Sequence, residues 1–156
     1  MNPSRRKFNF VLSSAVLIPA ILKSSVVTAA QGDAMTVYKS PYCGCCGAWI
    51  DHVKASGIRV KVTNMEDVTP VKRHYGIAPE LHSCHTAVVG GYVIEGHVPA
   101  EDIMRLILNA PEAKGLAVPG MPIGSPGMEQ GSTREPYRVF LFGNKGVSVF
   151  SRYNGA

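Results

Sequence analysis

The sequence predicts an α/β domain whose elements follow the order β-α-β-α-β-β-α. Three observations support this order: short runs rich in β-branched residues, apolar residues at helical spacing between these runs, and Gly or Pro at the boundaries. The chain has 156 residues, of which 46% are hydrophobic and 17% are charged. This composition excludes an intrinsically disordered chain, and the length suits a single domain.

The order begins with a strand, a helix and a second strand. A β-prone run covers 36–39. Apolar residues at helical spacing, among them Trp49 and Val53, predict a helix from 43 to about 56. Apolar and charged residues alternate in 58–63, which predicts a half-buried strand.

The order continues with a short helix, a hairpin and a longer helix. The short helix is predicted within 64–76. Two β-prone runs, 86–89 and 92–95, flank a Gly-Gly pair and predict a β-hairpin. In 99–109, proline and two acidic residues precede apolar residues at helical spacing, which predicts a helix.

This order of elements is that of a thioredoxin-like fold. After it, residues 111–136 carry five Gly, five Pro and two Met without periodicity, so we predict a long Gly/Pro-rich loop there. Two further β-prone runs, 137–142 and 147–153, predict a C-terminal β-hairpin.

The net positive charge of the chain lies at its N-terminus. Sixteen Lys and Arg against eleven Asp and Glu give a formal charge of +5, and residues 1–30 hold four of the basic residues and no acidic one. A basic cluster, an apolar run and small residues follow one another there, which is typical of a signal peptide. The start, Ser4-Arg5-Arg6-Lys7-Phe8, resembles a twin-arginine signal. An ordinary Sec signal is the alternative.

Cleavage of this segment would remove most of the net positive charge of the chain, and with it the electrostatic attraction to acidic partners. The remaining 12 basic and 11 acidic residues give a net charge of +1, so we expect no nucleic-acid partner. The apolar run at 10–22 is shorter than the about 20 residues that span a bilayer, so we expect no stable membrane insertion after cleavage. We therefore predict an exported, periplasmic protein with a cleaved signal at 1–30 and a single domain at 31–156.

Three of the four cysteines lie at the predicted start of the first helix. Cys43 and Cys46 have the C-x-x-C spacing of thiol–disulfide oxidoreductases, and Cys45 lies between them. The exposed N–H groups and the dipole of a helix N-terminus lower the pKa of a thiol. Cys84 lies just before the third strand, which in a thioredoxin-like fold starts beside this helix N-terminus. We therefore expect the four sulfurs to converge.

Four clustered cysteines in an exported protein have three interpretations. Two structural disulfides suit an oxidising compartment, but they would force near-adjacent cysteines to pair. A thiol–disulfide oxidoreductase needs only two of the four. A thiolate site for Cu(I) or Zn(II) uses all of them. We favour the metal site, since the neighbours Cys45 and Cys46 suit thiolates that bridge several Cu(I) ions better than one tetrahedral ion.

Two histidines and two methionines are further candidate ligands. His85 follows Cys84 directly, and both reach one site only if the chain is irregular there, because neighbours in a strand point to opposite faces. His97 follows the fourth strand, at the edge where the third begins. Met121 and Met128 lie in the Gly/Pro loop and carry thioethers, which are soft Cu(I) ligands. Packing of the loop onto the domain is the alternative role for these methionines. We expect three histidines to lie outside the site: His52, His74 and His82.

Several short motifs of the chain, taken together, are specific: Val37-Tyr-Lys-Ser-Pro41, Cys43-Gly-Cys45-Cys46, Ser83-Cys84-His85-Thr86-Ala87, Glu95-Gly-His97-Val-Pro99, Gly115-Leu-Ala-Val-Pro-Gly-Met121 and Gly124-Ser-Pro-Gly-Met128-Glu129. They resemble the CopG-like periplasmic copper-resistance proteins, and the resemblance covers about 35–156. It implies a thioredoxin-like fold and a multinuclear copper cluster bridged by Cys43, Cys45, Cys46 and Cys84. It also suggests that copper cycles between Cu(I) and Cu(II) as a detoxification step.

We therefore predict an exported copper-binding protein of copper resistance, with the metal-binding domain at 31–156. Its expected partners are copper ions and either a periplasmic electron-transfer protein or a copper efflux system. Redox turnover of copper would make it an oxidoreductase. Two alternatives stay open: a thiol–disulfide oxidoreductase that uses Cys43 and Cys46, and a passive copper carrier or store.

Overall fold

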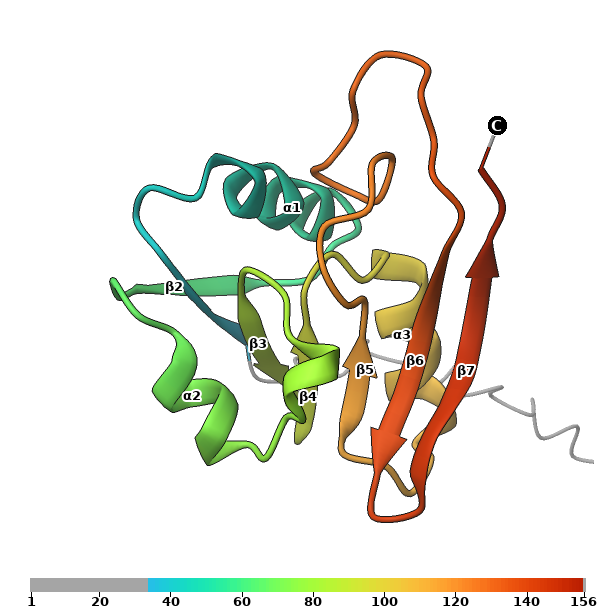
Figure 1. The fold of residues 1–156 in the computed structure, drawn as a ribbon. Helices are drawn as coiled ribbons and strands as arrows, with labels where there is room; N and C mark the ends of the chain where they lie inside the picture. Colours follow the sequence, from blue (N-terminus) through green and yellow to red (C-terminus); the bar gives the residue numbers. More distant parts are fainter. Residues whose placement is uncertain (1–33, 156) are drawn as a thin grey trace, which may run out of the picture. The chain divides into compact units, whose positions relative to one another are not determined.

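The computed structural model describes residues 34–155, so the predicted signal at 1–30 and its cleavage lie outside the described residues. The described chain forms a seven-stranded sheet in the order β2-β1-β3-β4-β5-β6-β7, with three α-helices and one short 3-10 helix (Figure 1). The strands are β1 (Met35–Lys39), β2 (Val60–Asn64), β3 (Thr86–Val89), β4 (Tyr92–Glu95), β5 (Gly115–Ala117), β6 (Tyr137–Gly143) and β7 (Gly146–Tyr153). The helices are α1 (Gly44–Ala55), α2 (Thr69–His74), the 3-10 helix η1 (Pro79–Leu81) and α3 (Ala100–Asn109).

The mixed α/β class and the predicted order of elements are confirmed from β1 to α3. β1 pairs parallel to β2 and antiparallel to β3, and β3 and β4 form the predicted hairpin. The second predicted hairpin is β6 with β7. Because β1 and β3 are antiparallel, the end of β1 and the start of β3 lie at the same edge of the sheet. That edge carries the cysteine motif and Cys84.

The prediction of an unbroken loop at 111–136 is wrong. Gly115–Ala117 forms β5, which pairs parallel to β4 and antiparallel to β6 and so joins the C-terminal hairpin to the rest of the sheet. Gly115 permits a close approach there, since a Cβ at this position would lie 1.7 Å from the carbonyl oxygen of Val93. A strand of three residues is too short to show a period in the sequence.

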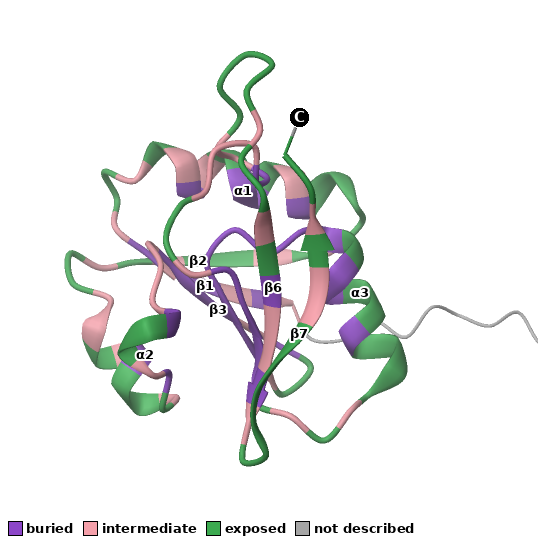
Figure 2. Cartoon of the chain, turned by 45° about the vertical axis from the view of Figure 1, so that its right-hand side comes forward, coloured by how far each residue is buried: buried purple, intermediate pink, exposed green. Residues whose placement is uncertain are grey.

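The core consists of two clusters on the two faces of the sheet. α1 and α3 cover one face, where Trp49 and Leu106 pack with Ile94. α2 and η1 lie on the other face, where Leu81 packs with Phe142. In Figure 2 the buried residues follow the central strands and the inner sides of α1 and α3, whereas the edge strand β2 is largely exposed. Among residues 34–155, no helix is both long and apolar enough to cross a membrane.

Candidate metal centre

The cysteine motif occupies the start of α1. Cys43 precedes the helix in an extended conformation, and its side chain makes no capping hydrogen bond to the first turn. Cys45 and Cys46 lie within that turn, and Cys46 is fully buried. The N–H groups at a helix N-terminus lack partners inside the helix and favour negative charge nearby. This position therefore favours thiolates.

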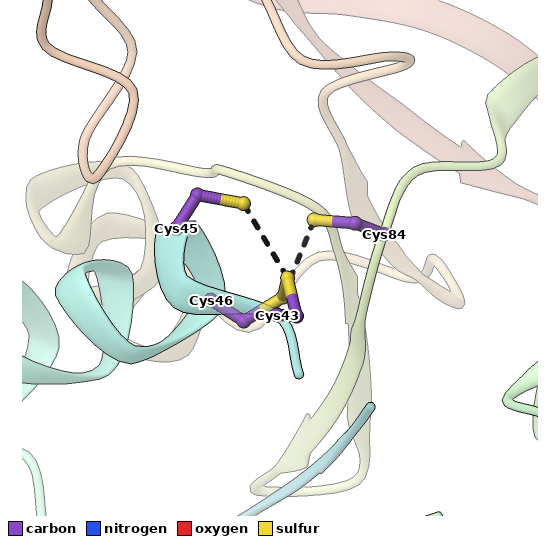
Figure 3. A group of neighbouring side chains, drawn as sticks. All are labelled: Cys43, Cys45, Cys46 and Cys84. Atoms are coloured by element: carbon purple, nitrogen blue, oxygen red, sulfur yellow. Dashed lines mark hydrogen bonds between the residues drawn. A yellow bond between two sulfur atoms is a disulfide. The ribbon is translucent and has the colours of Figure 1, made fainter. Parts of the chain in front are cut away.

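The structure brings all four sulfurs together (Figure 3). Cys43 and Cys46 form a disulfide. The sulfur of Cys45 lies 3.4 Å from that of Cys43, and the sulfur of Cys84 lies 3.5 Å from that of Cys46. All four lie within 4.8 Å of one another. This is the oxidised form of the C-x-x-C pair, and its reduction by two electrons and two protons would place four thiols in one small volume.

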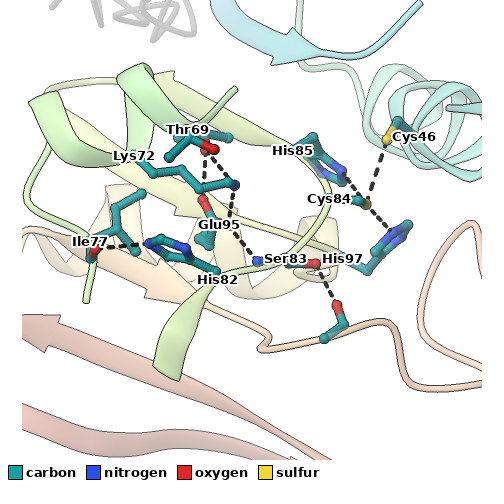
Figure 4. Close-up of polar contacts among 12 residues, drawn as sticks. Cys46, Thr69, Lys72, Ile77, His82, Ser83, Cys84, His85, Glu95 and His97 are labelled. Atoms are coloured by element: carbon teal, nitrogen blue, oxygen red, sulfur yellow. Dashed lines mark hydrogen bonds and ion pairs between the residues drawn. The ribbon is translucent and has the colours of Figure 1, made fainter. Parts of the chain in front are cut away.

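Cys84 connects the cysteines to two buried histidines (Figure 4). Its sulfur lies 3.3 Å from Nδ1 of His85 and 3.1 Å from Nε2 of His97. Cys84 and His85 both reach this point because β3 begins only at Thr86, so the two residues lie outside the regular alternation of the strand. The same three residues form a second group of possible metal ligands, and this group shares Cys84 with the first.

A backbone carbonyl fixes the orientation of His97. Nδ1 of His97 lies 2.8 Å from the carbonyl oxygen of Pro126. A carbonyl only accepts hydrogen bonds, so Nδ1 carries the proton and donates, while Nε2 keeps a lone pair directed at Cys84. Burial lowers the pKa of His97, which favours the neutral ring. Metal-binding histidines commonly have this arrangement.

His85 lies between two other rings. Its ring centroid is 4.3 Å from that of Trp49 and 5.0 Å from that of His97. Burial, followed by the nearby His97 and Lys72, holds the pKa of His85 well below its usual range, so the ring is neutral. Within residues 34–155, Nε2 of His85 has no hydrogen-bond partner. An unpartnered nitrogen in a buried ring is costly, which is consistent with a site that a ligand completes.

Burial also affects the thiol that the two groups share. Burial, together with the neighbouring Cys45, raises the pKa of Cys84 to about 12. Cys84 is therefore protonated at neutral pH in the oxidised form. A soft cation would bind the thiolate and displace this proton.

The loop after β5 folds against the cysteine motif. Gly127 has φ +84°, and a Cβ there would lie 2.6 Å from the backbone nitrogen of Trp49 and 2.7 Å from the carbonyl oxygen of Cys45. The neighbouring Pro126 contacts His97, as described above. Met128 follows Gly127 and is half-buried, whereas Met121 is 51% exposed. The loop thus contacts the first turns of α1 and the ring of His97, while metal ligation by the two methionines stays a prediction.

The structure assigns other partners to the three remaining histidines. Nε2 of His52 accepts a hydrogen bond from the backbone nitrogen of Ala100 and so caps the start of α3. His82 donates to the carbonyl oxygen of Ile77, and His74 at the end of α2 stacks edge-on against Tyr75.

Sequence reasoning missed three contributors to the site. The Pro126 carbonyl and the Gly127 contact involve backbone atoms, which leave no motif. The third is a buried ion pair between Lys72 and Glu95, whose carboxylate accepts the backbone N–H of Ser83 next to Cys84. Its members lie 23 residues apart on different elements, so no local pattern predicts that they pair.

Comparison with known proteins finds a family model that matches part of the chain and two solved structures that are similar to it. A family model described as a protein of unknown function, DUF411, matches residues 81–128, which include Cys84, His85 and His97. Two solved structures of copper resistance protein CopG are similar. Form 1 is 41% identical, with 80% of this chain and 100% of that chain covered and a TM-score of 0.75. Form 2 is 42% identical, with 77% and 97% covered and a TM-score of 0.73. No curated protein sequence matches this chain.

Proposed function

Since the chain belongs to the CopG family of copper resistance proteins, we propose that it binds Cu(I) through Cys43, Cys45, Cys46 and Cys84. One observation carries this proposal: the four sulfurs converge within 4.8 Å at a helix N-terminus. Soft thiolates select Cu(I) over harder cations. The residues here also match the donor set that copper prefers, since two neutral imidazoles adjoin the sulfurs.

The two ligand groups suit two oxidation states of copper. The four cysteines offer sulfur, which favours Cu(I), while His85 and His97 add nitrogen, which also suits Cu(II). We therefore propose a cysteine-bridged, multinuclear centre at which copper cycles between Cu(I) and Cu(II). Copper supplies the one-electron chemistry. The chain binds it, orients His97 through Pro126 and shields the imidazoles from water.

The disulfide sets a condition for binding. Disulfide sulfurs carry no charge, so the oxidised protein offers two thiols where the reduced protein offers four. We expect the reduced protein to bind more Cu(I) per chain than the oxidised protein. The measurement is metal content and free-thiol count of protein purified from copper-fed cells, with and without a reductant, and with Zn(II) as competitor. Reduced protein that retains no copper, or that prefers Zn(II), would exclude the proposal.

The methionines of the loop are proposed as further ligands. We expect a Met121→Leu/Met128→Leu variant to bind Cu(I) roughly tenfold more weakly or worse, because leucine keeps the volume but not the thioether. Competition with a chromogenic Cu(I) chelator measures the affinity. Met104→Leu on α3 is the control, since Met104 is exposed and lies outside the loop. Unchanged affinity in the double variant assigns the methionines to packing alone.

A thiol–disulfide oxidoreductase is the second candidate function, and the Cys43–Cys46 disulfide favours it. We propose that β1 to β4 with α1, α2 and α3 form a thioredoxin-like core. In this alternative the Cys43 thiolate attacks a substrate disulfide, and Cys46 then displaces the substrate as a dithiol while the pair becomes oxidised. A Cys45→Ser/Cys84→Ser variant should keep this activity without metal. Under the copper proposal the same variant loses the metal.

The cellular setting follows from the same proposal. We propose that the protein works in the periplasm after export and cleavage of its signal. Its partners would be a periplasmic electron-transfer protein, if copper turns over, or a copper efflux system. A passive carrier or store would use the same ligands and show no redox turnover with such an electron donor or acceptor.

A further inference from the structure

A buried ion pair lies on the α2 side of the sheet, outside the group of candidate ligands. Nζ of Lys72 on α2 lies 2.5 Å from Oε1 of Glu95 at the end of β4, and their side chains are 5% and 0% exposed. Thr86 completes the network: its hydroxyl accepts from Lys72 at 3.1 Å and donates to Oε2 of Glu95 at 2.6 Å. Buried ion pairs are weak evidence for stability, because desolvation offsets most of the attraction. The pair therefore needs another explanation.

The carboxylate also holds the backbone beside Cys84. Oε1 of Glu95 accepts the backbone N–H of Ser83 at 2.6 Å, and Ser83 directly precedes Cys84 (Figure 4). The Ser83 hydroxyl donates to the carbonyl oxygen of Gly120, and the Gly120 nitrogen donates to the carbonyl oxygen of His82 at 3.0 Å. The turn that carries Cys84 is thus fixed from two sides, and Glu95 provides the charged contact.

Glu95 also lies in the same segment as His97, two residues before it, so the contact with Ser83 joins this segment to the turn that carries Cys84. Between them, Gly96 has φ +73°, and a Cβ there would lie 2.5 Å from Cβ of Ser83 and 2.6 Å from the carbonyl oxygen of Val118. Three chain segments therefore meet here without space for another atom. The distance of 3.1 Å between the Cys84 sulfur and Nε2 of His97 depends on how these segments meet.

We infer that Lys72 and Glu95 are positioning residues of the metal centre: Lys72 fixes the Glu95 carboxylate, and Glu95 holds the Ser83 amide so that Cys84 meets both imidazoles. The inference rests on the proposed copper function. It concerns the arrangement of the ligands, and neither residue touches the metal.

The test replaces the ion pair with apolar residues of similar volume. In a Lys72→Met/Glu95→Leu variant the fold should persist, since such replacements are often neutral for stability. The Ser83 amide loses its acceptor, so we expect Cu(I) affinity to fall by about 10–100-fold, the usual effect of removing an outer-shell partner. In a Lys72→Met/Glu95→Gln variant the glutamine amide oxygen can still accept from Ser83. This variant should recover much of the affinity.

Asp102 offers a matched control. It is a buried carboxylate, 3% exposed, that accepts hydrogen bonds from Arg105 at 2.8 Å and Ser151 at 2.6 Å, between α3 and β7. Asp102→Asn should lower stability, measured by urea unfolding, while Cu(I) affinity stays at the wild-type value. If Asp102→Asn weakens copper binding as much as Lys72→Met/Glu95→Leu does, the effect is general destabilisation and the inference is wrong.

Two readouts need no copper, so they separate this inference from the proposed function. The Ser83 amide proton should shift upfield in the NMR spectrum of the apolar variant, because it loses a charge-assisted hydrogen bond. The rate at which iodoacetamide alkylates Cys84, followed by peptide mass spectrometry, should rise as its turn loosens. If neither readout changes, Glu95 does not position Cys84. If both change but wild-type protein binds no copper, positioning holds and the copper proposal fails.

Discussion

Cys84→Ser is expected to abolish the proposed copper centre, whereas Cys45→Ser should retain part of it. Cys84 belongs to both ligand groups. Its sulfur lies 3.5 Å from the sulfur of Cys46. The same sulfur lies 3.3 Å from Nδ1 of His85 and 3.1 Å from Nε2 of His97. Cys45 belongs only to the group of four cysteines. Serine keeps nearly the same shape but replaces a soft sulfur with a hard oxygen, which Cu(I) binds poorly.

The measurement is copper content after gel filtration, together with Cu(I) affinity from chelator competition under reducing conditions. For Cys84→Ser we expect a loss of affinity beyond the about 10–100-fold that an outer-shell partner contributes. Far-UV circular dichroism and thermal unfolding check the fold, which should persist because Cys84 is only half-buried. A Cys84→Ser variant that holds as much copper as Cys45→Ser would show that Cys84 does not join the two groups.

Gly127→Ala is expected to destabilise the protein and weaken copper binding at the same time. At φ +84° an alanine is strained by about 1–2 kcal/mol. Its Cβ would also lie 2.6 Å from the Trp49 nitrogen and 2.7 Å from the Cys45 oxygen, and overpacking of this kind costs about 1–3 kcal/mol. The free energy of unfolding should therefore fall by about 2–5 kcal/mol. In the variant the loop should move away from α1, and the Pro126 carbonyl would then no longer orient His97 for copper binding.

A Gly131→Ala variant separates the effect of backbone strain from the effect of overpacking against α1. Gly131 lies in the same loop at φ +57°, and a Cβ there would meet no atom within 4 Å, so this variant carries the backbone strain alone. Urea unfolding should show the smaller loss of about 1–2 kcal/mol, with Cu(I) affinity unchanged. Equal effects of the two substitutions on unfolding and on copper binding would mean that the contact between Gly127 and α1 does not support the site.

The parts of the site that the sequence predicts are those set by local spacing and by strand direction. Cys43, Cys45 and Cys46 follow from their spacing at a helix start. The approach of Cys84 is expected from the thioredoxin-like order of elements, and the antiparallel pairing of β1 and β3 produces it in the structure. His97 follows from the hairpin that returns the chain to the same edge. These inferences need only the type and order of the elements, which hydrophobic periodicity indicates, and the fold class to which that order belongs.

The structural features that the sequence does not predict depend on backbone atoms or on pairs of residues far apart in the chain. β5 has three residues, and its pairing with β4 depends on the missing side chain of Gly115. Neither the Pro126 carbonyl that orients His97 nor the Lys72–Glu95 pair has a local signature. The redox state of the cysteines also has no signature in the sequence, because the C-x-x-C spacing of Cys43 and Cys46 occurs in redox-active disulfides as well as in metal sites.

At the proposed site, copper binding would be coupled to folding, because two of the candidate ligands, Cys84 and His97, lie far along the chain from the three cysteines of the motif. Cys84 lies 38 residues from Cys46, and His97 lies another 13 residues from Cys84, so an unfolded chain cannot hold these donors together. A ligand that binds only the native state raises the free energy of unfolding by mass action, by about 2.7 kcal/mol at 100 times its dissociation constant. Copper-loaded protein should therefore resist proteolysis longer than copper-free protein. Copper supply would in this way set how much of the protein persists, as well as how much of it is loaded.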